Sequence, residues 1–130
     1  MSHKMMKTLL LLCLGLLNIL APAHACSLSV KVNVHVVNNL PSGSKLKIHC
    51  ASGDDDLGFH TLSINKEFQW GFCANPRTLF FCHLWWGPKQ RAFDVFVSSI
   101  LIYPLHVWSA RADGIYEAVN GTFVKKFDWK

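Results

Sequence analysis

Apolar and polar residues alternate strictly along residues 28–36, where a leucine and four valines take turns with serine, lysine, asparagine and histidine. A period of two turns one side of the segment toward a core and predicts a half-buried β-strand. Turn-forming asparagine, proline, serine and glycine follow at residues 38–43, and residues 45–50 alternate again. We expect the two alternating segments to form a hairpin, or a strand with a nearby return strand.

Short apolar segments separated by turn residues continue along the chain. Residues 78–86 contain almost no polar position, which favours a strand buried on both faces at the centre of its sheet. Asp113-Gly114 and Asn120-Gly121 are typical of tight hairpin turns. The other expected strands cover 59–64, 68–73, 93–97, 103–110, 115–119 and 122–127. The pattern predicts an all-β fold, a small antiparallel β-sandwich of about eight short strands.

Residues 1–25 have the pattern of a cleavable secretory signal peptide. Two lysines precede an apolar run over residues 8–20, and Ala23 and Ala25 occupy the A-x-A positions of a cleavage site. The apolar run is shorter than the roughly 20 residues that a membrane-spanning helix needs. We expect cleavage after Ala25, a single mature domain over residues 26–130, and secretion to the extracellular space without stable membrane insertion.

Cysteine content and charge limit the functions open to the mature chain. An even set of cysteines would enter an oxidising compartment, which predicts disulfides among Cys26, Cys50, Cys73 and Cys82, with three pairings open. Loss of the two lysines lowers the formal net charge from +5 to +3. This mild excess suits acidic surfaces, but the chain lacks the dense Lys/Arg stripe of a nucleic-acid-binding protein.

Two groups of residues resemble metal ligands, and each has a simpler interpretation. The three adjacent aspartates at 54–56 lack the spacing of a calcium loop and better fit a turn or an exposed recognition loop. His49-Cys50 and Cys82-His83, with Cys73, resemble zinc ligands, but cysteines of a secreted chain more often form disulfides. We expect no metal site and no cofactor.

A catalytic role would have to come from histidines. His49, His60 and His83 are candidate general acids or bases, but their spacing specifies no reaction. Motifs such as G-x-S-x-G and H-E-x-x-H are absent from the sequence, which argues against an enzyme.

Aromatic residues and a sequon are the remaining candidate features. A sugar-stacking platform is one interpretation of the tryptophans, but a place between two sheets is the stronger one for most of Trp70, Trp85, Trp86, Trp108 and Trp129. Asn120-Gly121-Thr122 is an N-glycosylation sequon, and its predicted turn makes Asn120 accessible.

Five ordered blocks of the chain resemble the plant self-incompatibility S-protein homologues. The blocks are His49-Cys50, Asp54 to Gly58, Thr78 to Cys82, Phe93 to Phe96, and Trp108 with Asp113 to Tyr116. Together they cover nearly the whole mature chain in the family's order. The resemblance implies a secreted, monomeric β-sandwich without known catalysis, whose founding members are pistil ligands read by a pollen receptor.

The resemblance also bears on the disulfides. Cys50 and Cys82 both lie in matched blocks, which favours a bridge between them, and both share a strand face with apolar residues. Members commonly carry two more cysteines in the region that corresponds to residues 102–106, where this chain has none. Cys26 and Cys73, outside the matched blocks, are the candidates for a replacement pair.

We therefore expect a secreted signalling ligand of the self-incompatibility type, which binds a cell-surface receptor through exposed loops and needs no cofactor. The loops expected to carry recognition are 52–58, with Asp54, Asp55 and Asp56, and 87–91, with Lys89 and Arg91. The alternative is a basic secreted defence protein that binds microbial membranes or wall glycans. A small hydrolase that uses the histidines is a third hypothesis.

Overall fold

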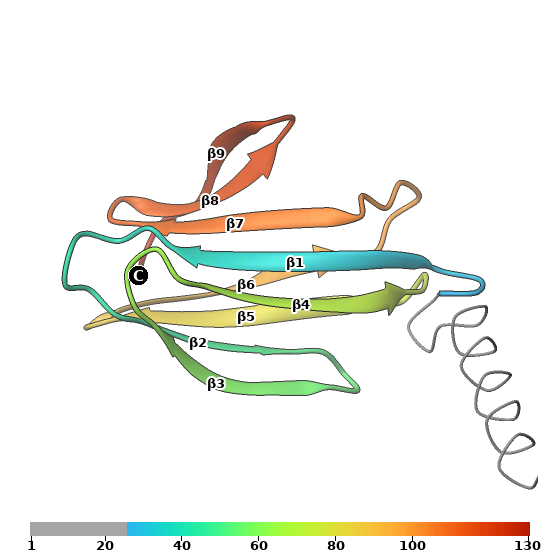
Figure 1. The fold of residues 1–130 in the computed structure, drawn as a ribbon, viewed down its shortest axis with the longest axis horizontal. Helices are drawn as coiled ribbons and strands as arrows, with labels where there is room; N and C mark the ends of the chain where they lie inside the picture. Colours follow the sequence, from blue (N-terminus) through green and yellow to red (C-terminus); the bar gives the residue numbers. More distant parts are fainter. Residues whose placement is uncertain (1–25) are drawn as a thin grey trace, which may run out of the picture.

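The computed structural model describes residues 26–130, which form a sandwich of two β-sheets (Figure 1). The predicted signal peptide lies outside the described residues. The all-β sandwich predicted from the sequence is confirmed, and the described residues contain nine strands. These are β1 (Val30–Asn38), β2 (Leu46–Ala51), β3 (Asp56–Leu62), β4 (Glu67–Ala74), β5 (Leu79–Trp86), β6 (Lys89–Val97), β7 (Leu105–Arg111), β8 (Gly114–Val119) and β9 (Thr122–Phe127).

The strands divide into a five-stranded sheet, in the order β4-β1-β7-β8-β9, and a four-stranded sheet, in the order β3-β2-β5-β6. Neighbouring strands are antiparallel except β1 and β7, which run parallel. β1 and β2 lie in different sheets, so the expected hairpin of the first two segments is wrong. Alternation fixes which side of a strand is buried but not which strand lies beside it.

The core lies between the sheets and consists of the inward residues of the alternating segments. Its fully buried members include Val32, Val34, Val36, Leu46, Ile48 and Leu84. Trp108 is also buried, and its indole Nε1 donates a hydrogen bond to the carbonyl of Val95 at 3.1 Å. Trp70, Trp86 and Trp129 pack against this core from partly buried positions. Four of the five tryptophans thus follow the core interpretation.

β5 is central in the four-stranded sheet, as expected, but only one of its faces is buried. Cys82 and Leu84 are fully buried, whereas Leu79 and Phe81 are 39% and 41% exposed. The expectation of burial on both faces is therefore wrong. Outward aromatic residues such as Trp85 pack against one another and against neighbouring strands of the same sheet, without a third layer above them in the described part of the chain.

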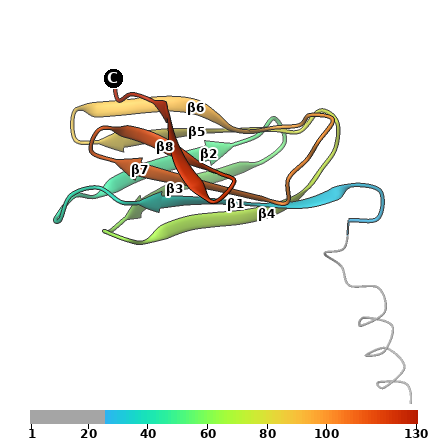
Figure 2. The ribbon, with the colours of Figure 1, turned by 90° about the horizontal axis from the view of Figure 1, so that it is seen from above.

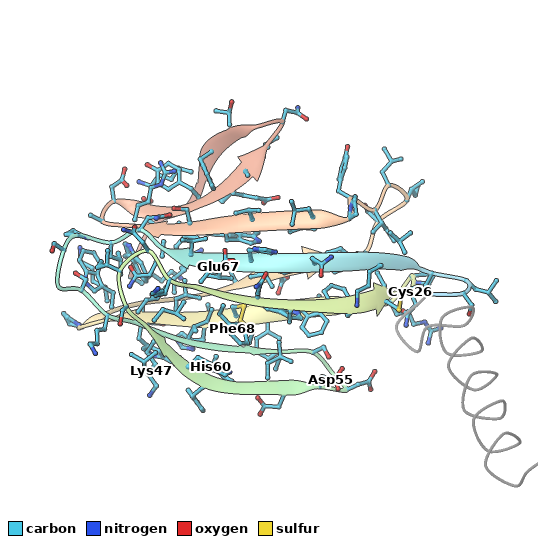
Figure 3. All side chains as sticks on the ribbon, in the orientation of Figure 1. Cys26, Lys47, Asp55, His60, Glu67 and Phe68 are labelled. Carbon is cyan, nitrogen blue, oxygen red and sulfur yellow. A yellow bond between two sulfur atoms is a disulfide. The ribbon has the colours of Figure 1, made fainter. Side chains whose placement is uncertain are left out.

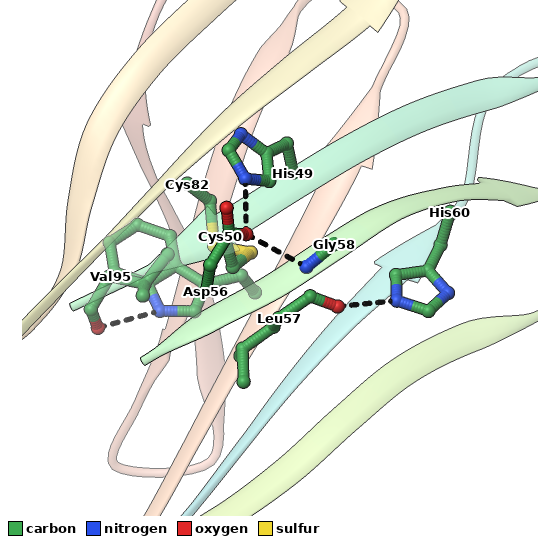
Figure 4. Close-up of a disulfide and its surroundings, with 9 residues drawn as sticks. His49, Cys50, Asp56, Leu57, Gly58, His60, Cys82 and Val95 are labelled. Atoms are coloured by element: carbon green, nitrogen blue, oxygen red, sulfur yellow. Dashed lines mark hydrogen bonds and ion pairs between the residues drawn. A yellow bond between two sulfur atoms is a disulfide. The ribbon is translucent and has the colours of Figure 1, made fainter. Parts of the chain in front are cut away.

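Two disulfides connect the strands. Cys50 of β2 lies directly opposite Cys82 of β5, and this bridge is fully buried between the sheets (Figure 4). Cys26 bridges Cys73 near the end of β4 and attaches the N-terminal segment before β1 to the sandwich (Figure 3). These are the two pairs that the family resemblance favoured.

The turns gather at two opposite ends of the sandwich. One end, here called the β2–β3 end, holds the β2–β3 turn, the β4–β5 turn, the β6–β7 loop and the N-terminal segment (Figure 1). The opposite end, called the β5–β6 end, holds the β5–β6 turn and the C-terminal residues. There Lys130 and Gln90 exchange two backbone hydrogen bonds of 3.0 Å, so the chain ends beside β6 (Figure 2).

Candidate functional site

The β2–β3 turn is a compact loop that exposes two carboxylates. The backbone N–H of Ser52 donates to the carbonyl of Asp55 at 2.7 Å, and the N–H of Asp55 donates to the Ser52 hydroxyl at 3.1 Å. These bonds close the turn on itself and leave the side chains of Asp54 and Asp55 exposed. Figure 3 shows Asp55 at this end of the molecule, away from the core. The turn therefore presents a compact negative tip.

Asp56 differs from the two preceding aspartates, because neighbouring groups engage its carboxylate. Asp56 Oδ1 accepts the N–H of Gly58 at 2.9 Å and lies 2.6 Å from Nε2 of His49 (Figure 4). The Gly58 hydrogen bond, followed by the bond to His49, lowers the pKa of Asp56 below its ordinary value of 3.8. Asp56 fixes the start of β3 and is not free in the way that Asp54 and Asp55 are.

The neighbouring β4–β5 turn holds Arg77 on a fixed backbone. The side-chain oxygen of Asn75 accepts the N–H of Arg77 at 2.8 Å, and the N–H of Asn75 donates to the Thr78 hydroxyl at 2.9 Å. The hydroxyl of Ser98 donates to the carbonyl of Asn75 at 2.5 Å, and Pro76 restricts the turn further. Asn75-Pro76 is a typical turn-forming pair, but nothing in the sequence pattern singles out Arg77.

An open groove of about 740 Å³ lies between the two turns. Asp54 and Asp55 line it from the β2–β3 turn, Arg77 lines it from the β4–β5 turn, and Phe72 and Phe81 contribute aromatic surface. Opposite charges around an aromatic surface suit a peptide or loop that carries both charged and apolar side chains. The groove is therefore the candidate recognition site.

Large apolar side chains extend this surface. Leu28 is 100% exposed, Ile100 is 103% exposed and Leu101 is 72% exposed. Leu28 and Ile100 line a second open groove of about 580 Å³, which the β4–β5 turn also borders. Exposed apolar groups in one region are typical of interaction surfaces. The β2–β3 end thus combines fixed charges with unburied aliphatic side chains.

The second expected recognition segment does not form a loop. β6 begins at Lys89, so two residues alone connect β5 to β6. Lys89 Nζ lies 5.2 Å from the ring centre of Trp86, and the guanidinium of Arg91 lies 4.9 Å from that of Phe127. A two-residue connection returns the chain directly into strand pairing, which is why Lys89 and Arg91 belong to β6. This turn and the acidic turn lie at opposite ends (Figure 1).

The histidines and the cysteines beside them point to opposite faces of the sheet. His49 and His83 lie opposite each other on the outer face of the sheet, whereas the neighbouring cysteines point inward and are bridged. His60 stacks on Phe68 with ring centres 4.3 Å apart. Within residues 26–130, no group of three or more His, Cys, Asp or Glu side chains could hold a metal ion.

The sequon lies in the β8–β9 turn, as its sequence suggested. Asn120 and Gly121 have φ angles of 51° and 79°, which is the backbone of a tight hairpin turn, and Thr122 begins β9. Asn120 is exposed.

Fold and site together define a small disulfide-bridged β-sandwich whose candidate recognition surface lies on its turns. Residues 33–129 match the family described as plant self-incompatibility protein S1. The chain belongs to this family. No helix in the described residues is long and apolar enough to cross a membrane.

Relatives with known names agree with this assignment. S-protein homolog 29 of Arabidopsis thaliana is 33% identical over 127 residues, which cover 94% of this chain and 92% of that protein. S-protein homolog 20 of the same plant is 35% identical over 98 residues, covering 68% and 70%. A solved structure of the self-incompatibility protein homologues, described as a widespread family of small, highly stable, secreted plant proteins, matches with a TM-score of 0.67. It is 17% identical and covers 78% of this chain and 96% of that chain, which shows the shared fold.

Proposed function

We propose that this protein is a secreted signalling ligand, without catalytic activity, that a cell-surface receptor recognises through the β2–β3 end. Membership in the family supports secretion, because the solved homologues are described as secreted. The two disulfides add support, since such bridges form and persist in oxidising compartments. The observation that carries receptor binding is the groove that Asp54, Asp55 and Arg77 line beside the exposed Ile100.

A protein partner fits this end better than a lipid bilayer. Two unpaired carboxylates at the tip would be repelled by anionic headgroups, although the neighbouring aliphatic side chains favour burial. A receptor with a basic and partly apolar docking site satisfies both features. The charged part would act chiefly on association rate and salt dependence.

Binding of the labelled mature protein to plant cells tests this proposal. We expect saturable binding that is lost when the cells are treated with a protease. The variant Asp54→Asn/Asp55→Asn removes two charges while keeping side-chain size, and we expect its affinity to fall about tenfold at low salt and less at high salt. Glu67→Gln/Asp128→Asn is the control for net charge, because it removes two exposed carboxylates outside the groove, which pair with His35 and Lys125.

Three outcomes would contradict the proposal. Equal loss in the control variant would show a general charge effect, and unchanged binding in the acidic-turn variant would remove the groove from recognition. Binding that survives protease treatment and is reproduced by vesicles of the extracted lipids would favour the alternative, a basic protein that acts on membranes.

Processing is testable separately. Intact-mass analysis of the exported product is expected to show a chain that begins at Cys26. We also expect an added glycan mass that disappears in Asn120→Gln. A product that retains the first 25 residues would contradict the signal peptide.

A further inference from the structure

The outer face of the four-stranded sheet carries an ordered cluster that points away from the core. Lys47 and His49 project from β2, Phe59 from β3, and His83 and Trp85 from β5. Strand register places His49 opposite both Phe59 and His83, and it places Lys47 opposite Trp85. We call these five residues the histidine–aromatic stack.

Ring contacts link four residues of the stack in the order His49, Phe59, Trp85 and His83. The rings of His49 and Phe59 are stacked with centres 4.3 Å apart, and those of His83 and Trp85 are stacked at 3.9 Å. The rings of Phe59 and Trp85 have centres 5.9 Å apart. The ammonium group of Lys47 lies 4.9 Å from the Phe59 centre and 5.3 Å from the Trp85 centre.

Hydrogen bonds hold the imidazole at each end of the row. Nε2 of His49 lies 2.6 Å from Asp56 Oδ1 (Figure 4), and Nε2 of His83 lies 2.7 Å from Gln90 Oε1. Asp56 is itself held by a backbone N–H. Because both Nε2 atoms donate to an oxygen acceptor, Nδ1 is the ring nitrogen that remains for a ligand, and it can donate to a carboxylate when the ring is protonated.

Lys47 gives the stack its positive charge, and its ring systems lie outside the core. Phe59 is 61% exposed, so it adds little to the core that lies on the other side of the sheet. Imidazole stacking and the lysine ammonium each engage a face of Phe59 or Trp85, which reduces the open ring face that a ligand could stack on. The surface therefore favours an anion over an uncharged sugar that needs an open ring face.

Charges around the stack are arranged unevenly. Lys45 is the preceding outward residue on the β2 side, next to Lys47, and Lys89 begins β6 at the same end. The acidic residues Asp54, Asp55 and Asp94 lie toward the opposite end of the sheet, where Asp94 is opposite Phe81. An anionic chain would therefore bind along the half of the face that begins at the β5–β6 end.

We propose that the histidine–aromatic stack binds an acidic polysaccharide. Its carboxylates would pair with Lys47 and with the imidazoles of His49 and His83. A nucleic acid fits less well, because bases stack on open aromatic faces and these are engaged. A protein partner fits less well too, because the cores of protein interfaces are depleted in lysine.

This proposal does not depend on receptor binding, because it uses a sheet face and not the groove. Titration calorimetry of the mature protein with oligogalacturonate of defined length tests it. Fully methyl-esterified oligogalacturonate keeps the sugar rings but removes the charge, and we expect it not to bind. Equal affinity for the esterified form would overturn the proposal.

Variants identify the surface. We expect Lys47→Gln to weaken binding about fivefold or more, which corresponds to one exposed charge pair with hydrogen-bonding support. Lys126→Gln is the matched control, because Lys126 is an exposed lysine on β9 in the other sheet. Equal weakening in both variants would reduce the effect to net charge and refute the site. Equal affinity for a single-stranded oligonucleotide of the same charge would refute the polysaccharide assignment.

Acidity gives an independent readout. Histidine is the side chain whose charge ordinarily changes between about pH 5 and 8, which makes acidity a test of the two imidazoles. The groups that face the imidazoles are Asp56 at His49 and the uncharged Gln90 at His83, and Lys47 projects from the same face of the sheet. We expect tighter binding at about pH 5.5 than at about pH 7.5, and we expect His49→Gln/His83→Gln to remove that difference. A pH effect that persists in the double variant would contradict a role for the imidazoles.

Discussion

The two disulfides should contribute unequally to stability, for a reason that loop length does not provide. The Cys50–Cys82 bridge spans 32 residues of sequence and the Cys26–Cys73 bridge spans 47. In the chain-entropy model each stabilises the fold by about 4 kcal/mol, and the longer loop is favoured by only ~0.3 kcal/mol. Loop entropy alone therefore predicts nearly equal effects, slightly larger for Cys26–Cys73.

We expect the native structure to reverse this order, so that loss of Cys50–Cys82 costs more stability than loss of Cys26–Cys73. Cys50 and Cys82 are fully buried, so replacing both by alanine also leaves a small cavity between the sheets, and we expect a total loss of about 5 kcal/mol. Cys26 belongs to the segment before β1, and this segment gains freedom in the native state when its bridge is removed. That native-state gain offsets part of the entropy that the denatured chain gains when the bridge is removed, so we expect a loss of only about 2 kcal/mol for Cys26→Ser/Cys73→Ser.

Urea unfolding followed by tryptophan fluorescence measures both variants against the parent protein. A loss of about 5 kcal/mol is a large part of the 5–15 kcal/mol typical of a small domain, and it lowers Tm on the order of 20 °C or more. Both variants should also show a larger m-value, because the denatured chain becomes less compact. A larger loss for Cys26→Ser/Cys73→Ser would refute the argument from burial, and unchanged m-values would refute the argument from the denatured chain.

Three smaller perturbations test other parts of the fold. Trp108→Phe removes the 3.1 Å hydrogen bond to the buried Val95 carbonyl, and we expect a loss of about 2 kcal/mol in urea unfolding. Gly114→Ala should cost more than Gly121→Ala in thermal unfolding, because an added Cβ at 114 would lie 2.5 Å from a β9 backbone oxygen, whereas at 121 it meets open space. The pKa of Asp56 is lowered, so its support of the β2–β3 connection is complete above pH 3.8 and is lost as pH falls through the lower folded value. Amide exchange in that turn should show this loss in the parent protein and not in Asp56→Asn.

Most of the fold prediction rested on the alternation of apolar and polar residues, and the predictions that were wrong have a physical cause. Residues 28–36 and 45–50 were correctly predicted as strands, yet the alternation could not say that β1 would pair with β4 and β7 while β2 joined the other sheet. Burial of β5 on both faces was wrongly predicted from its composition. The outward His83 and Trp85 of β5 make ring contacts with each other and with Phe59 of β3, which a hydrophobic count cannot distinguish from contacts with a core.

Local sequence signals predicted the geometry of the acidic turn. Three aspartates before a glycine indicated a tight exposed turn. One of them, Asp56, accepts the N–H of Gly58, while the side chains of Asp54 and Asp55 are exposed. The sequence could not predict that Arg77 lines the groove, because the order of the strands in the two sheets is what brings the β4–β5 turn to it. The histidine–aromatic stack likewise depends on the register of three strands.

Asp56 contacts both proposed surfaces, so experiments that test them separately should leave this residue unchanged. Its carboxylate binds the Gly58 N–H that shapes the end of the acidic turn, and it also holds the His49 imidazole at one end of the stack. Loss of this carboxylate would therefore disturb both receptor binding and polysaccharide binding, and the result could be mistaken for a single shared site. Substitutions at Asp54 and Asp55 alter only the groove, and a substitution at Lys47 alters only the stack. If the two surfaces act independently, combining these substitutions should give additive losses in each assay, because the changed groups share no partner.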